Sequence, residues 1–149
     1  YIIIILGDIK MVDQNCAYCM EGELVAKFGI KICELETSKV YLFKEQSHPG
    51  RCIVAHKKHV GDMNELTAEE RAAYFEDVAR VARAIMKAFN PDKVNYGAYG
   101  DTGHHLHFHL CPKYKDEYEW GGVFLMNPDK KYLTDEEYAA MIEKIKANL

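Results

Sequence analysis

The stretch that decides the fold is HLHFHLC, residues 105–111. Histidines alternate with apolar residues in it, and a repeat of two is the period of a β-strand. The imidazoles of His105, His107 and His109 therefore share one face of the predicted strand, with neighbours about 6–7 Å apart. The apolar residues between them supply the packing of the opposite face. A solvated edge strand is the alternative, but three imidazoles in strict alternation favour a functional face.

The same stretch resembles the signature of the histidine triad (HIT) family, His-φ-His-φ-His-φ-φ, where φ is an apolar residue and Cys111 fills the last position. The resemblance extends to a Pro-Gly turn at 49–50, the apolar residues after it, and Lys-Lys-His at 57–59. It implies an α+β fold, with an antiparallel sheet of about five strands, a long helix and a C-terminal helix. It also implies a homodimer, joined through the long helix and an edge strand.

The resemblance further implies a set of catalytic residues. His107 is the implied nucleophile, which forms a nucleotidyl-histidine intermediate at the α-phosphate of a purine nucleotide. Histidine suits this role because it is nucleophilic near neutral pH. We expect its other ring nitrogen to donate to a backbone carbonyl of the same strand. His109 then holds or protonates the phosphate oxygens, and His105 orients the strand. The further implied nucleotide contacts are Asn95, Gly100 and Thr102.

The implied activity is that of a nucleoside phosphate or phosphoramidate hydrolase, such as a phosphoramidase or a dinucleoside polyphosphate hydrolase, or of a nucleotidyl transferase. Arg51 departs from the pattern, because many family members carry a fourth active-site histidine there. A guanidinium can grip phosphate bidentately but cannot shuttle a proton. Two alternatives are that Arg51 is simply a surface strand residue, or that the nearby His48 takes over the role of the fourth histidine. A nucleotide-binding or adaptor protein with weak or vestigial catalysis is therefore the second interpretation. The family's acidic or amide ribose-binding residue also has no clean counterpart around residues 43–45.

Cys16 and Cys19 form a C-x-x-C pair. Alone, such a pair is compatible with a redox pair, half of a zinc site or two plain thiols. A closed zinc site needs two further nitrogen or sulfur ligands. In zinc-bearing members of the resembled family they are the histidine after Lys-Lys and the first histidine of the triad, which are His59 and His105 here. The resemblance thus implies a structural zinc ion on these four residues. Free thiols, with His59 at a strand end, are the alternative.

Capping signals and periodicity predict the remaining elements. Thr67 to Glu70 form a capping box before a long helix that Asn90 and Pro91 end, and a second capping box at 134–137 precedes a C-terminal helix. The short polar turns between the early strands favour an antiparallel meander. The predicted strands are 24–28, 30–35, 40–43, 51–56, 93–99 and 105–110.

Size and charge set the outer limits. The chain has 149 residues, a net charge of −4 and five cysteines without the spacing of a disulfide scaffold. These values predict one domain at residues 11–149 in the reducing cytoplasm. No nucleic-acid partner is expected from this charge, and no membrane partner, because the apolar run at 1–6 is too short to span a bilayer. Residues 1–10 are interpreted as a non-native or upstream extension, with an extra edge strand as the alternative.

Overall fold

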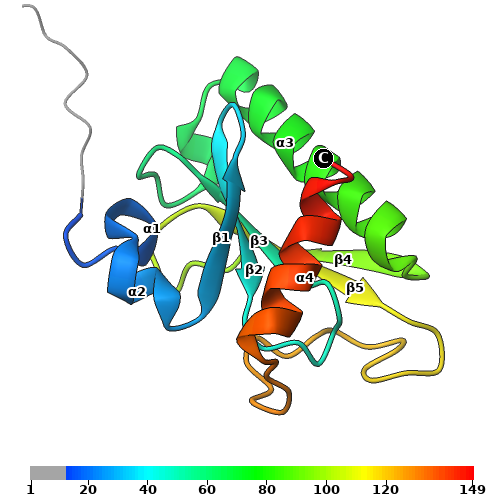
Figure 1. Cartoon of the computed structure of the whole chain (residues 1–149). Helices are drawn as coiled ribbons and strands as arrows, with labels where there is room; N and C mark the ends of the chain where they lie inside the picture. The colour runs from blue at the N-terminus through cyan, green and yellow to red at the C-terminus, as the bar shows by residue number, and fades with distance from the viewer. Residues whose placement is uncertain (1–12) are drawn as a thin grey trace, which may run out of the picture.

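The computed structural model describes residues 13–149 (Figure 1). The helices are α1 (Ala17–Met20), α2 (Gly22–Ala26), α3 (Ala68–Phe89) and α4 (Asp135–Lys146), and one 3-10 turn, η1, spans Met63–Glu65. The strands are β1 (Gly29–Glu34), β2 (Ser38–Phe43), β3 (Cys52–His56), β4 (Lys93–Gly97) and β5 (His107–Lys113). Within residues 13–149, every helix is too short or too polar to cross a membrane. The interpretation of residues 1–10 lies outside the described residues and stays a prediction.

The strands form one sheet in the order β1-β2-β3-β5-β4, and each neighbouring pair is antiparallel. This confirms the predicted α+β architecture with its long helix and C-terminal helix. The triad strand β5 lies between β3 and β4, with Ala55 opposite His107 and Ile53 opposite His109. His107 and His109 therefore belong to an inner strand, and the alternative of a solvated edge strand is wrong. His105 lies in a bend just before β5, so the predicted strand at 105–110 begins two residues too early.

The two faces of the sheet carry different cores. On one face, α3 and α4 pack together against alternate strand residues (Figure 1), and this main core includes Val54, Tyr74, Ile85, Phe108, Leu110, Tyr138 and Ile145. On the other face, Tyr18 of α1 and Val25 of α2 pack with Tyr41, Phe43 and Ile53. Because successive residues of a strand point to opposite faces, His107 and His109 lie on the face of α1. A short N-terminal segment therefore covers the histidine face.

The long helix begins and ends where the sequence predicts. Thr67 and Glu70 cap each other's backbone N–H groups, and Asn90 closes the helix in the left-handed conformation. The predicted strand at 24–28, in contrast, is wrong, because α2 occupies Gly22–Ala26 and β1 begins at Gly29. Only Val25 of α2 is buried. A short apolar run carries too few residues for its period to distinguish a strand from a helical turn.

A buried carboxylate ties α3 to the sheet. Asp77 Oδ2 accepts hydrogen bonds from Thr37 N at 2.9 Å, Thr37 Oγ1 at 2.7 Å and Ser38 Oγ at 2.8 Å. Thr37 lies in the turn between β1 and β2, so these contacts fix the hairpin on the helix. A hydrogen bond to a charged acceptor contributes about 1.5–3 kcal/mol to stability, which makes this clamp a large local contribution.

Candidate active site

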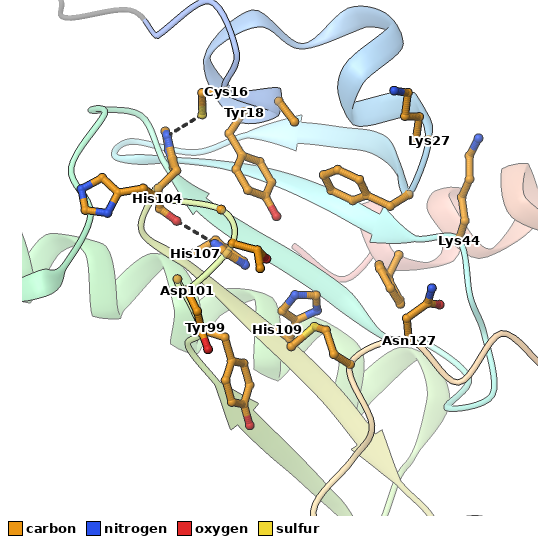
Figure 2. A pocket seen from close by; sticks show the side chains of 18 of the residues that line it. Cys16, Tyr18, Lys27, Lys44, Tyr99, Asp101, His104, His107, His109 and Asn127 are labelled. Atoms are coloured by element: carbon orange, nitrogen blue, oxygen red, sulfur yellow. Dashed lines mark hydrogen bonds between the residues drawn. The ribbon is translucent and has the colours of Figure 1, made fainter.

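The histidine face of β5 opens into a cavity of about 600 Å³ (Figure 2). Figure 2 shows His107 and His109 side by side, with Tyr18 of α1 on one side and Tyr99 on the other. The predicted site residues that line this cavity are Cys16, Gly100, Thr102, His105, His107 and His109. Arg51 and Asn95 are absent from the described lining. Asn95 is half-buried in β4 opposite Cys111, so the geometry gives its predicted phosphate contact no support.

The ring of His107 is held in its neutral form with one fixed tautomer. Its Nδ1 lies 2.7 Å from the carbonyl oxygen of His105, and because a carbonyl can only accept, Nδ1 carries the ring hydrogen. The predicted backbone acceptor within the triad is thus confirmed. Nε2 keeps its lone pair. Burial lowers the pKa of His107 below its usual range, and this keeps the lone pair available at neutral pH.

His109 is also neutral, but its hydrogen is on the other nitrogen. Its Nδ1 lies 3.1 Å from Nη2 of Arg51, which can only donate, so Nε2 carries the hydrogen. Burial, with smaller effects of the Arg51 and His107 charges, lowers the pKa of His109 to about 2. Of the two predicted roles, holding phosphate oxygens fits this state. Protonating them does not fit, because the imidazolium is scarcely populated at neutral pH.

Arg51 lies behind His109 rather than in the cavity. The side chain is fully buried. Nη1 donates to the carbonyl of Leu125 at 3.1 Å, and Nη2 donates to the carbonyl of Met126 at 2.9 Å. The surface-residue alternative is therefore wrong, and the geometry does not favour a direct grip on phosphate. His48 does not take over the role either, because its Nε2 lies 2.6 Å from Oε2 of Glu119 and it is outside the described lining.

Two groups of lining residues escaped the sequence analysis. Tyr18 packs its ring 5.2 Å from that of His105 and 4.9 Å from that of His107, and so covers both imidazoles. Lys27 and Lys44 reach the rim of the cavity, with their amino groups directed away from the histidines (Figure 2). A tyrosine two residues after Cys16 carries no sequence signal of its own, because its position depends on how α1 packs on the sheet.

Glu45 is the second residue after β2, and it also lines the cavity. Oε1 accepts hydrogen bonds from the backbone N–H of Lys131 at 2.9 Å and from the hydroxyl of Ser47 at 2.5 Å. Oε2 is buried and has no hydrogen-bond partner among the described residues. A buried carboxylate oxygen without a donor is uncommon in a folded protein, and this one belongs to a residue that lines the cavity. Glu45 is thus a candidate for the ribose-binding residue that the sequence analysis did not find.

The four predicted metal ligands come together at one end of the cavity. The ligand atoms of Cys16, Cys19, His59 and His105 all lie within 4.8 Å of one another. Nδ1 of His105 is 3.3 Å from Cys16 Sγ, 3.6 Å from Cys19 Sγ and 3.3 Å from His59 Nδ1. A tetrahedral zinc ion with two sulfur and two nitrogen ligands has edges of about 3.3–3.8 Å. The residues therefore fit a zinc ion.

His105 connects this cluster to His107. Its Nε2 donates to the carbonyl of His56 at 2.7 Å, so Nδ1 is left without a hydrogen and can bind a metal. Its own backbone carbonyl accepts the hydrogen of His107. His105 thus joins the metal cluster through its ring and fixes the tautomer of His107 through its backbone carbonyl.

The fold and the histidine face together define the class of protein. The chain belongs to the histidine triad family, and the HIT domain matches residues 29–116, from the start of β1 to just beyond β5. The family resemblance read from the sequence is confirmed.

The chain is similar to a phosphoramidase, to a further family protein and to solved structures. Adenosine 5′-monophosphoramidase hnt1 of Schizosaccharomyces pombe is 26% identical over 145 residues, which cover 91% of this chain and 99% of that protein. Protein hit of Bacillus subtilis is 28% identical over 123 residues, covering 78% and 83%. A histidine triad protein of Sinorhizobium meliloti has a TM-score of 0.79 at 24% identity, covering 86% and 95%. A Zn-bound histidine triad family protein of Mycobacterium smegmatis has a TM-score of 0.59 at 22% identity, covering 80% and 85%.

Proposed function

We propose that this chain is a nucleotide hydrolase or nucleotidyl transferase that acts at the α-phosphate of a purine nucleotide through His107. Family membership and the phosphoramidase relative support nucleotide hydrolase or transferase chemistry in general. The observation that carries the finer proposal is the state of His107. Its hydrogen is committed to the His105 carbonyl, and its Nε2 lone pair remains free on a residue that lines the cavity.

The reaction has two displacement steps. In the first, the Nε2 lone pair forms a bond to the α-phosphorus, and the leaving group departs with the electron pair of the bond that breaks. The His105 carbonyl stabilises the positive charge that develops on the ring of His107. In the second, water or another acceptor attacks the phosphorus, the electron pair of the P–N bond returns to Nε2, and the acceptor's proton passes to solvent.

Binding of the nucleotide follows from the groups around His107. The Nε2–H of His109 donates to the phosphate oxygens, and backbone N–H groups of 100–103 with the hydroxyl of Thr102 complete their surroundings. Glu45 Oε2 accepts from the ribose hydroxyls, since no described residue donates to it. Phe28 and Phe43 offer apolar surface for the purine.

The proposal includes a structural zinc ion held by Cys16, Cys19, His59 and His105. Two thiols and two imidazoles form a donor set that zinc prefers, and their spacing fits. When bound, the ion supplies a cross-link between α1, the loop after β3 and the triad. The chain itself contributes two hydrogen bonds, one from His105 Nε2 to the carbonyl of His56 and one from His107 Nδ1 to the carbonyl of His105.

A second copy of the chain is also part of the proposal. Phe75 and Met86 of α3 and Tyr96 of β4 are large exposed side chains, and among residues 13–149 β4 is an edge strand of the sheet. Exposed apolar residues beside an unpaired strand edge favour symmetric association. Light scattering on a size-exclusion column should give twice the chain mass, and Tyr96→Lys should halve it. A monomeric wild-type protein would rule out this part.

The test of the activity uses AMP phosphoramidate, ADP and diadenosine polyphosphates as substrates. We expect wild-type protein to turn over at least one of them and samples quenched in alkaline denaturant, which preserves a P–N bond, to carry a nucleotidyl group on His107. His107→Asn should retain the fold and nucleotide binding but lose turnover. Micromolar binding in calorimetry without turnover of any substrate would instead favour a nucleotide-binding or adaptor protein, the alternative that Arg51 raises.

A further inference from the structure

Arg51 is a buried cation whose Nη1 and Nη2 atoms are hydrogen-bonded and whose plane lies against two aromatic rings, while its Nε has no hydrogen-bond partner among the described residues. Its guanidinium carbon lies 4.2 Å from the ring centre of Phe43 and 4.9 Å from that of Phe124. The carbonyls of Leu125 and Met126 accept its hydrogens at 3.1 and 2.9 Å. A planar group held between two rings and two carbonyls has little freedom to turn. It therefore presents Nη2 to His109 in one fixed orientation.

This orientation dictates where His109 carries its hydrogen. A guanidinium has five donor hydrogens and no acceptor, so Nδ1 of His109, 3.1 Å from Nη2, must accept. The single hydrogen of the neutral ring is then on Nε2. A doubly protonated His109 would point its Nδ1–H at the N–H of Arg51 Nη2 and would place two positive charges side by side in a buried site. Both effects disfavour the imidazolium.

We infer that Arg51 is a positioning residue that holds His109 as a neutral hydrogen-bond donor, so that the site favours nucleotides whose leaving group departs as a stable anion over those that release an amine. Phosphate and carboxylate leaving groups belong to the favoured class. The leaving-group preference rests on the proposed function and narrows its substrate class, whereas the positioning of His109 stands independently.

The electron balance of the first step gives the physical reason. The leaving group takes the electron pair when its bond to phosphorus breaks. A phosphate or carboxylate holds that pair as a stable anion, whereas an amine must gain a proton as it leaves. Neutral His109 donates a hydrogen bond from Nε2 but does not transfer this hydrogen, because an imidazolate would result. The other triad rings do not supply the proton, since His105 donates its hydrogen to His56 and His107 donates its hydrogen to His105.

The first test reads the tautomer and needs no turnover. Nitrogen-15 NMR of the wild-type protein should show His109 with a bare Nδ1 and a protonated Nε2 from pH 8 down to about pH 5, well below the ordinary histidine pKa of about 6.5. A protonated Nδ1, or an imidazolium that forms near pH 6.5, would overturn the inference. Because this measurement uses the wild-type chain, it decides on the positioning even if a variant fails to fold.

The second test measures the leaving-group preference. The substrates are the 4-nitrophenyl and 4-methoxyphenyl esters of AMP, which share a shape but differ in the stability of the departing anion. Arg51→Lys keeps a cation that only donates. Arg51→Gln offers an amide oxygen that can accept from a protonated His109. Arg83→Gln, at an exposed arginine paired with Glu76 on α3, is the matched control.

We expect Arg51→Gln to lower the nitrophenyl-to-methoxyphenyl ratio of kcat/KM by at least about tenfold, because a general acid contributes about 10²–10⁴-fold to such a step. Arg51→Lys and Arg83→Gln should keep the wild-type ratio. An unchanged ratio in folded Arg51→Gln would overturn the leaving-group preference. If the wild-type protein turns over neither ester nor any other nucleotide, the proposed function fails, and the NMR result still decides on the role of Arg51.

Discussion

The neutral state of His109 makes the stability of the fold depend on pH in a predictable way. In the unfolded chain a histidine takes up a proton below about pH 6.5. In the folded protein the pKa of His109 is lowered to about 2 by burial and by Arg51. Between these values the unfolded state binds a proton that the folded state does not bind, so stability is full above pH 6.5 and falls as the pH falls.

The size of this effect follows from the same two pKa values. Each pH unit below 6.5 costs about 1.4 kcal/mol, so at pH 5 His109 alone lowers the free energy of unfolding by about 2 kcal/mol. For a chain of this size, that corresponds to about 4–8 °C in Tm. The loss continues towards pH 2, where the folded state takes up the proton too.

Urea denaturation at pH 8 and pH 5 measures this loss. His109→Asn removes the titrating ring, while the Asn carbonyl can still accept from Arg51. We expect its stability to fall by about 2 kcal/mol less than that of the wild-type protein over this range. His104→Asn removes an exposed neighbouring imidazole and serves as the matched control. If wild type and His109→Asn lose stability equally, His109 is charged in the folded state, and the account of the site is wrong.

Three further predictions concern the metal cluster, the clamp on α3 and the ribose subsite. Metal analysis of the wild-type protein should find about one zinc ion per chain. Cys16→Ser should lose this ion, and Cys33→Ser should keep it because Cys33 lies outside the cluster. A metal-free wild-type protein would contradict the prediction. Asp77→Ala should lower the free energy of unfolding, measured by urea denaturation, by about 3 kcal/mol, because the donors of Thr37 and Ser38 lose a charged acceptor. A loss below about 1 kcal/mol would show that Asp77 does not hold the β1–β2 hairpin on α3. Glu45→Gln should weaken AMP binding in calorimetry about tenfold and leave 2′,3′-dideoxy-AMP unaffected; equal losses for both ligands would refute a ribose contact.

The alternating histidines and the capping boxes are local signals, and they predicted the triad strand and the two main helices, whereas the architecture as a whole was implied by the family resemblance. The period of two at 105–111 requires only neighbouring residues, so the strand and its histidine face follow directly from the sequence. The same holds for the long helix, whose cap at Thr67 and end at Asn90 both appear as predicted. The family resemblance added the four residues of the Cys/His cluster, which the fold brings within 4.8 Å.

Other features depend on contacts that the local pattern does not contain. The apolar run at 24–28 fits a strand or a helical turn equally well, and packing on the sheet selected the helix α2. Arg51 follows a turn and precedes a strand, which is typical of a surface position. It is buried because carbonyls 74 and 75 residues further along the chain accept its hydrogens.

The sequence by itself determined which residues face the cavity from β5, since a strand alternates its faces whatever surrounds it. Only the tertiary structure decided the chemical state of those residues. The carbonyl of His105 decides which nitrogen of His107 carries the hydrogen, and the guanidinium of Arg51, just before β3, decides this for His109. Oε2 of Glu45 is free to accept a hydrogen bond because no described residue donates to it. Tautomers and charges respond to the atoms within about 3–4 Å, and the fold brings those atoms from distant parts of the chain.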